Sequence, residues 1–229
     1  MNELVKISIL SLVLTLAAYR LAVWLRQKTK LSFLSPVVVG AMLVLPVLWA
    51  VKLPQKDYQQ GMELVSWLLT PATVCLAIPM YEHLQTLRKS FPAVLAGVIA
   101  GSASCILTIL LFAPVFGFDR TLTVSLLPKS VTTAIGVPLT QMIGGLGSVT
   151  TAAIILSGIT ASILGPTLCK LFRLTDKVAQ GTAFGTAGHV IATAKAMELD
   201  PLIGATSSLS LVVAGLLTAA VLPILANFI

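Results

Sequence analysis

The sequence predicts an all-α integral membrane protein, a bundle of about six full spans plus two broken or re-entrant helices. Of its 229 residues, 57% are hydrophobic and 10% are charged, whereas soluble domains carry about 25% charged residues. The mean hydropathy is +0.99. So few charges cannot cover a water-facing surface, but a lipid-facing surface needs none, because lipid tails are as apolar as leucine.

Six apolar runs are each long enough to cross a bilayer, which takes about 20 helical residues. They cover residues 4–24, 31–51, 62–81, 91–112, 148–169 and 203–226. The first run ends in charged residues without a small-residue cleavage site, so we expect a retained span rather than a signal peptide. No linker divides the chain, and we expect one transmembrane domain over residues 1–229.

Two further segments, 122–145 and 178–199, predict broken helices. Both are apolar enough to enter the membrane, and both carry glycine or proline, hydroxyl residues and a cation in mid-segment. Irregular backbone at membrane depth is stable only against protein or a water-lined cavity. In transporters, such segments mark the substrate site.

Lysine and arginine set the expected topology, because cytoplasmic loops carry an excess of both. The gaps at 25–30, 82–90 and 170–177 are basic. All three lie inside only if 122–145 enters and leaves on the outer side. Segment 178–199 is then re-entrant from the inside, and both termini lie outside. The alternative, a full crossing by 122–145, would place gap 170–177 outside.

An internal repeat is suggested at an offset of 57 residues, where Pro71 matches Pro128 and Pro166 matches Pro223. A unit of one re-entrant segment and one span crosses the membrane an odd number of times, so successive copies would be inverted. Chance identity in so apolar a chain is the alternative. The expected repeats lie near 71–113, 128–170 and 185–227.

Charge and cysteine usage disfavour several function classes. The net charge of +7 comes mainly from short gaps between apolar runs, which indicates topology signals rather than nucleic-acid binding. Cys75, Cys105 and Cys169 form no CxxC pair and are typical of small buried hydrophobes, with a disulfide or a metal site as the alternatives. The sequence contains no GxSxG, P-loop or metal-spaced cluster, so we expect no enzyme, cofactor or metal.

The motif Pro128–Thr133 indicates an anion site. Proline suits the start of a helix, and a half-helix starting at Pro128 would point free N–H groups and its positive end into the membrane. Lys129 adds a full charge that would suit a carboxylate. Hydroxyl donors are supplied by Ser130, Thr132 and Thr133. Alternatively, Lys129 snorkels to the outer interface and the hydroxyls bond backbone carbonyls.

The motif around Gly185 indicates a second half of the same site. Glycine allows a break and close backbone approach, and helical spacing places Thr186, His189 and Thr193 on one face. His189 could bond an anion or carry a proton, whereas the alternative is a structural hydrogen bond. The predicted binding residues here are Thr186, Gly188, His189 and Thr193.

Two further features, a pair of charged residues and a set of prolines, predict local structure. Lys195 and Glu198 are spaced for an ion pair at a helix end. Two prolines in the run 62–81 imply a break or, alternatively, a simple kink. The predicted helix-break residues are Pro71, Thr73, Pro79, Pro128, Pro138 and Gly185.

Three strings carry a family resemblance: LLTPATVCLAIPMYEHL, LLPKSVTTAIGVPLTQMIGG and GTAFGTAGHVIATAKAMELDPLIGATSSLSLVVAG. They resemble the LrgB/CidB family over nearly the whole chain. That family includes the C-terminal part of plastid glycolate/glycerate transporters. The sequence departs from its pattern at Ala134, Gly188 and Ala192, where the family would have proline, serine and glycine. Ala134 weakens the argument for a second break near Thr133, and Gly188 removes a hydroxyl from the site.

The resemblance implies two competing functions. One is a carrier of small 2-hydroxy or 2-oxo monocarboxylates such as glycolate, glycerate and pyruvate. The other is an antiholin-like modulator of murein hydrolase export and autolysis. It also implies a bacterial inner membrane, a separately encoded LrgA/CidA-like (holin-like) partner and, as an open matter, a homo-oligomer. A lysine–hydroxyl cluster within the membrane is needed only by a carrier, so we expect transport.

Overall fold

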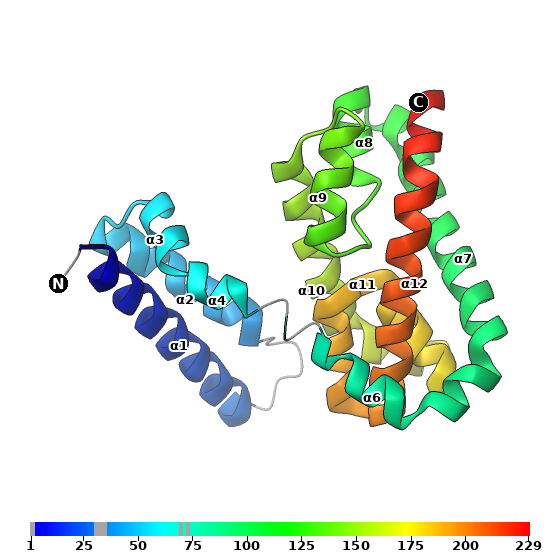
Figure 1. Ribbon diagram of the computed structural model, residues 1–229, viewed down its shortest axis with the longest axis horizontal. Coiled ribbons are helices and arrows are strands. Elements are labelled where there is room, and N and C mark those ends of the chain that lie inside the picture. The colour runs from blue at the N-terminus through cyan, green and yellow to red at the C-terminus, as the bar shows by residue number, and fades with distance from the viewer. Residues whose placement is uncertain (1–2, 30–35, 69–70, 72–73) are drawn as a thin grey trace. The chain divides into compact units, whose positions relative to one another are not determined.

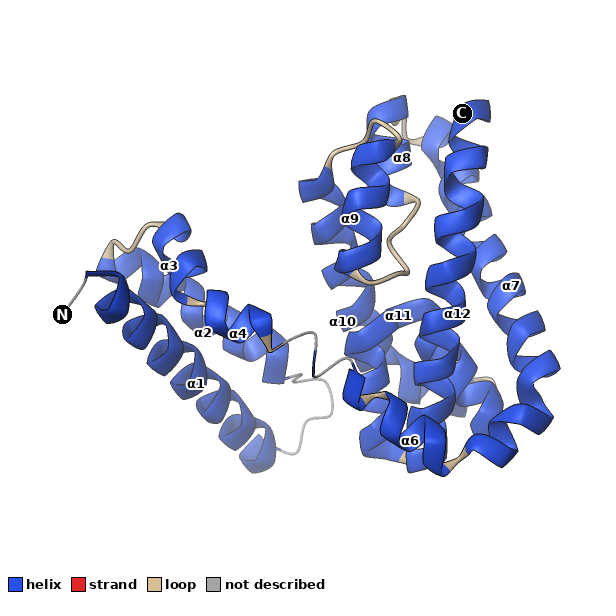
Figure 2. Ribbon diagram, viewed as in Figure 1, coloured by secondary structure: helices blue, strands red, loops and turns tan. Residues whose placement is uncertain are grey.

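The computed structural model describes residues 3–29, 36–68, 71 and 74–229 (Figure 1). Every regular element in that part of the chain is a helix (Figure 2). Among these helices, four are long and apolar enough to cross a membrane: Val5–Thr29, Leu84–Val115, Gly147–Leu171 and Pro201–Phe228. They coincide with four of the six predicted spans. The all-α membrane class is therefore confirmed, while six crossings stay a prediction.

The chain divides into two compact units, Met1–Cys75 and Leu76–Ile229. In the first unit, α1 packs against α2 and α3. Gly61 permits the α1–α3 contact, because a Cβ there would lie 2.6 Å from the Ser11 hydroxyl oxygen. The helices of this unit are α1 (Glu3–Thr29), α2 (Pro36–Val51), α3 (Gln55–Gly61) and α4 (Glu63–Trp67).

The predicted span over 62–81 is not among the candidate spans of the described residues. Helix α4 ends at Trp67 and α6 covers Ala77–Glu82, while residues 69–70 and 72–73 between them lie outside the described residues. Pro79 is not the break, because it lies in the first turn of α6, where its missing N–H removes no helical bond. Pro71 is exposed, and Thr73 lies outside the described residues.

The second unit is built around α12, whose small residues let neighbouring helices approach closely. Val94 and Val98 of α7 pack against Ala214 of α12 in one apolar cluster. The helices of this unit are α6, α7 (Leu84–Val115), α8 (Arg120–Leu126), α9 (Thr133–Met142), α10 (Gly147–Leu171), α11 (Lys177–Leu199) and α12 (Pro201–Leu225), followed by a short 3-10 turn.

Helices α8 and α9 form a hairpin whose two ends lie together (Figure 1). The Leu146 N–H, just after α9, donates to the Ser125 hydroxyl at 2.7 Å, and the Thr150 hydroxyl donates to the Ser125 carbonyl at 2.8 Å. The chain therefore leaves the hairpin at the end where it entered. This is the geometry that a re-entrant segment over 122–145 requires.

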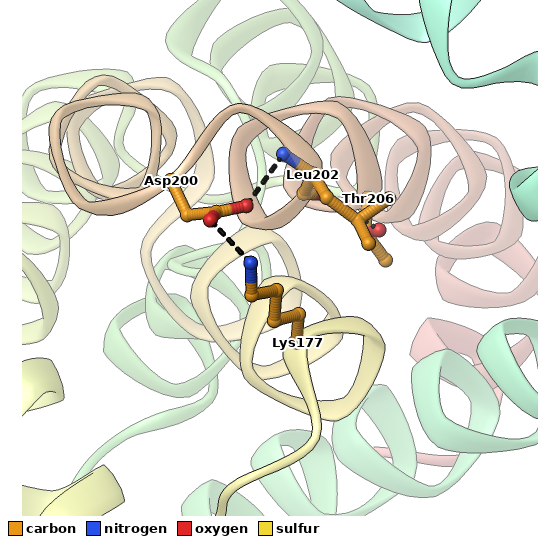
Figure 3. A network of polar contacts seen from close by, with 4 residues as sticks. All are labelled: Lys177, Asp200, Leu202 and Thr206. Carbon is orange, nitrogen blue, oxygen red and sulfur yellow. Dashed lines mark hydrogen bonds and ion pairs between the residues drawn. The ribbon is translucent and has the colours of Figure 1, made fainter.

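Helix α11 is a second hairpin, with its backbone break at His189 (φ 42°, ψ −139°). Its ends are joined by an ion pair of 2.6 Å between Lys177 and Asp200 (Figure 3). The Lys177 ammonium donates to the Asp200 carboxylate and holds its pKa below the usual range. Asp200 also caps α12, accepting from the Leu202 N–H at 2.9 Å. The other end of α12 lies beside the start of α8, because Arg120 donates to the Ala226 carbonyl at 3.0 Å.

The two hairpins therefore open at opposite ends of the second unit. The ends of α11 lie at the N-terminal end of α12, and the start of α8 lies at its C-terminal end. The predicted break at Gly185 is four residues too early. Gly185 lies in regular helix, and His189 is the residue with non-helical torsion angles.

Candidate functional site

The first part of the candidate site is the break between α8 and α9. The backbone of Lys129 and Val131 bonds back to Leu126 and Pro128 as turns at 3.1 and 3.2 Å. Thr132 is extended and occupies the N-cap position of α9. Pro128 lies in the predicted break, but the half-helix begins at Thr133 instead of Pro128, because these turns continue the end of α8.

Pro138 is not a break. It lies inside α9, which runs without interruption from Thr133 to Met142. Its ring removes one N–H, but the flanking residues keep the helix. Proline at this position costs one helical hydrogen bond without ending the helix.

A groove of about 630 Å³ runs along α7 and the first half of α11, with the α8–α9 break in its wall. Glycines of α7 create the room for this approach. A Cβ at Gly97 or Gly101 would lie 2.9 or 2.7 Å from the methyl groups of Thr182 and Thr186 of α11. The groove brings together three predicted site residues from two distant segments: Lys129, Ser130 and Thr186.

Lys129 is half-buried and lines the groove. Its backbone carbonyl accepts a hydrogen bond from the Ser157 hydroxyl at 2.6 Å, which fixes the break to α10. Within the described residues its ammonium has no ion pair. The carboxylate of Asp176, which lines the same groove, is held by the Ala179 N–H at 2.8 Å. The groove therefore presents an unpaired cation.

Thr186 supplies a second unsatisfied group. Its side chain is 6% exposed, and its buried hydroxyl has no hydrogen-bond partner in the described structure. The equivalent residue one turn earlier, Thr182, donates to the Val178 carbonyl at 2.9 Å. A buried hydroxyl without a partner is unfavourable by about 1–3 kcal/mol, so the exception at Thr186 points to a missing partner.

The other predicted binding residues do not line the groove. His189 is 3% exposed, and its Nε2–H donates to the Ile154 carbonyl at 2.8 Å. The Thr193 hydroxyl donates to the His189 carbonyl and hydrogen-bonds Ser207. Gly188 packs against Ala161. Thr132 and Thr133 begin α9, and neither is among the residues that line the groove. For His189, this geometry favours the structural hydrogen bond over a role as a ligand.

One turn near the middle of α10 forms hydrogen bonds to both breaks, the one between α8 and α9 and the one in α11. Ile154 accepts from His189, and Ser157 donates to the Lys129 carbonyl. Gly158 faces the His189 ring, where a Cβ would lie 2.7 Å from Cε1. The two breaks, far apart in sequence, therefore meet at the same level, as expected for two half-helices that enter from opposite ends.

The sequence argument missed Cys105. We interpreted it as a buried apolar residue, but it lines the groove and its Sγ lies 3.0 Å from the Ser130 Oγ. The signal was its place on α7 at helical spacing from Gly97 and Gly101. The predicted ion pair of Lys195 and Glu198 is confirmed, at 2.8 Å.

The sequence of the chain matches a known protein family. The model of the LrgB-like family matches residues 15–228. The chain belongs to the LrgB-like family. The match contains both hairpins and every residue that lines the groove. No solved structure matches this LrgB-like protein.

Proposed function

We propose that this LrgB-like protein carries small monocarboxylates, 2-hydroxy or 2-oxo acids such as glycolate, glycerate or pyruvate, across a bacterial inner membrane. The observation that supports this most is the unpaired ammonium of Lys129 in the groove. Charges within the membrane are unfavourable and usually serve a function. A carboxylate would neutralise this one, because opposite charges at contact distance attract strongly where water is scarce.

The groove also suits the rest of such an anion. With the carboxylate at Lys129, the Ser130 hydroxyl lies on the neighbouring residue of the break. The 2-hydroxyl or 2-oxo group would bond the Thr186 hydroxyl on the facing helix. Small apolar residues of α7 and α11, among them Gly101 and Ala187, leave space for a short carbon chain. The role that we assign to Thr186 explains why its hydroxyl lacks a protein partner.

The arrangement of helices supports an inverted repeat and alternating access. Helix α9 covers Thr133–Met142, and at an offset of 57 residues this corresponds to 190–199, the part of α11 that follows the break. Thr132 corresponds to His189, so both breaks fall at the same place in the repeat. Transporters of this kind move one hairpin-bearing half against the other around a central site. We propose six crossings on this basis.

A separate LrgA/CidA-like membrane partner belongs to the proposal, as does the lack of an enzymatic role. The competing function is an antiholin-like modulator of murein hydrolase export. That role has no use for an unpaired lysine beside an unsatisfied threonine. A carrier uses both.

Uptake of labelled pyruvate and glycolate by vesicles containing the chain, with and without the partner, tests the proposal. We expect saturable uptake that is lost in Lys129→Ala and impaired in Lys129→Arg, since the flat guanidinium replaces a compact ammonium. Membrane insertion of each variant is checked in parallel. Normal uptake by Lys129→Ala would contradict the proposal. An absence of uptake in all vesicles, together with altered murein hydrolase export from cells, would favour the competing function.

A further inference from the structure

We infer that Cys105 is a thiol-modification site inside the groove, where a small anionic disulfide or thiosulfonate would form an adduct that blocks anion passage. This inference rests on the proposed function for its effect on transport. The position of the thiol does not depend on that function. No role is otherwise evident for Cys105.

The first step of the argument is the contact between Cys105 and the anion-binding break. The Cys105 Sγ lies 3.0 Å from the Ser130 Oγ, and Ser130 follows Lys129 directly. Two independent features of the same groove point to a ligand there. The Lys129 ammonium has no ion pair in the described structure, and the hydroxyl of Thr186, a residue more than nine-tenths buried, has no partner.

The second step is the direction that an adduct must take. Behind Cys105 and Ser130 lies a pocket of about 10 Å³, lined also by Ser102 and Thr218, which has room for about one water molecule. The groove on the other side measures about 630 Å³. A group attached to the Cys105 Sγ therefore has to extend into the groove, beside Lys129.

The third step is the chemistry. The Cys105 thiol loses its proton to water, and the thiolate attacks the sulfenyl sulfur of a thiosulfonate. A new S–S bond forms while methanesulfinate leaves. With a small disulfide, the leaving group is the thiolate of that molecule. Lys129 draws anionic reagents toward the groove, and a dithiol reverses the adduct.

The other two cysteines provide the background for a test. Cys75 is exposed and belongs to the first unit. Cys169 is buried, with Phe184 in the same apolar cluster. In a full-length protein carrying Cys75→Ser and Cys169→Ala, Cys105 is the remaining thiol. Replacing Cys105 with serine as well keeps a polar partner for Ser130 and removes the reaction. Ser104→Cys or Ser102→Cys is then introduced into this protein without other cysteines. The two variants compare the reactivity of a thiol on the groove wall with that of a thiol in the small pocket.

The experiment measures labelling rates with the anionic reagent sulfonatoethyl methanethiosulfonate and with its cationic trimethylammonium analogue. We expect Cys105 and the Ser104→Cys thiol to react, and the Ser102→Cys thiol to react far more slowly. The anionic reagent should be favoured. Lys129→Gln should slow the anion and speed the cation by about fivefold each, the effect of one unit charge near contact in water, and so lower the anion-to-cation rate ratio by about thirtyfold. Pyruvate at ten times its Kd should slow labelling about tenfold, because about one-tenth of the grooves stay free. Labelled protein should lose uptake and regain it with dithiothreitol.

The inference would be overturned if Cys105 does not react. It would also be overturned if Lys129→Gln leaves the anion-to-cation rate ratio unchanged, or if fully labelled protein keeps its uptake. The proposed function fails separately. If pyruvate neither binds nor protects while the charge selectivity persists, the thiol site stands and the carboxylate site does not.

Discussion

Thr186 and Thr182 are the same residue type one turn apart on α11, yet only one of them has a satisfied hydroxyl. Both methyl groups face glycines of α7. Thr182 donates to the Val178 carbonyl, and the Thr186 hydroxyl has no partner in the described structure. The difference supports a role for Thr186 in binding a ligand and gives a matched pair of substitutions.

We expect Thr186→Val to stabilise the empty protein by about 1 kcal/mol, since an unsatisfied buried hydroxyl is removed without a change of shape. The same variant should bind pyruvate about tenfold more weakly. Thr182→Val should lose about 1 kcal/mol and keep its affinity. Thermal unfolding in detergent and equilibrium binding check both variants. An unchanged Kd in Thr186→Val would remove Thr186 from the site.

At the scale of single residues, the sequence predicted Lys129, Ser130 and Thr186, which the structure brings to one groove. Charge and hydroxyl content in an apolar run were sufficient signals for these. The place of His189 could not be predicted, because its hydrogen bond to Ile154 joins residues 35 positions apart. Cys105 has a sequence signal in its helical spacing from Gly97 and Gly101, but its contact with Ser130 exists only once α7 packs against the break.

At the scale of helices, the sequence predicted which segments are broken but not where. Gly185 was interpreted as the break in α11, yet a Cβ there would collide with the backbone carbonyl of Ser207. The glycine therefore serves the contact between α11 and α12. Pro138 and Pro79 lie inside helices. Pro79 lies in a first turn, where its missing N–H removes no helical bond.

Gly185→Ala should therefore separate α11 from α12 and destabilise the protein by about 1–3 kcal/mol. Gly40→Ala is the control, because a Cβ at Gly40 would make only ordinary contact, 3.8 Å from Tyr19. The control should be neutral or up to about 1 kcal/mol more stable, since alanine is the better helix former. Thermal unfolding monitored by circular dichroism compares the two. Equal stability of both variants would contradict the packing role of Gly185.

The ion pair between Lys177 and Asp200 predicts a pH effect at the open end of α11. The pKa of Asp200 is lowered in the folded protein, first by the hydrogen bond from Lys177. A carboxyl with a lowered folded pKa contributes stability above its unfolded value, about 3.9, and loses it as the pH falls through the folded value.

At pH 7, Asp200→Asn should lose at most about 1 kcal/mol, since the pair is partly exposed and the amide oxygen can still cap α12. Asp200→Ala should lose about 1 kcal/mol more. Unfolding curves recorded from pH 7 to pH 3 should show wild type and Asp200→Asn converging as the pH falls below about 4. A difference that grows toward low pH would contradict the assigned role.

At the scale of the whole chain, composition alone predicted the all-α membrane class. The share of charged residues depends on whether the surface faces water or lipid, and not on which residues are in contact. The run at 62–81 shows where this argument ends. Its hydropathy suits a span, but hydropathy carries no information on where α4 ends and α6 begins within it. The Lys and Arg bias predicted that segments 122–145 and 178–199 are re-entrant. In the structure both are hairpins, and within the second unit they open at opposite ends.

The topology predicts that gaps 82–90 and 170–177 lie on the same, cytoplasmic side. Within the second unit, the start of α11 lies beside the first half of α7, since Val178 packs against the cluster of Val94, Val98 and Ala214. Cysteines introduced at Arg88 and Lys177 should both react with an impermeant thiol reagent only when the cytoplasmic face is accessible. Labelling of the two positions from opposite faces would contradict the re-entrant hairpins.

The central claim is that Lys129 binds the carboxylate of a small monocarboxylate, and equilibrium binding of pyruvate to the purified protein tests it most directly. Lys195→Gln is the matched control, because Lys195 is paired with Glu198 and does not line the groove. We predict that Lys129→Gln raises the Kd by about ten- to a hundredfold, the usual effect of losing a charged hydrogen bond, while Lys195→Gln leaves it unchanged. Equal Kd values for wild type and Lys129→Gln would contradict the claim.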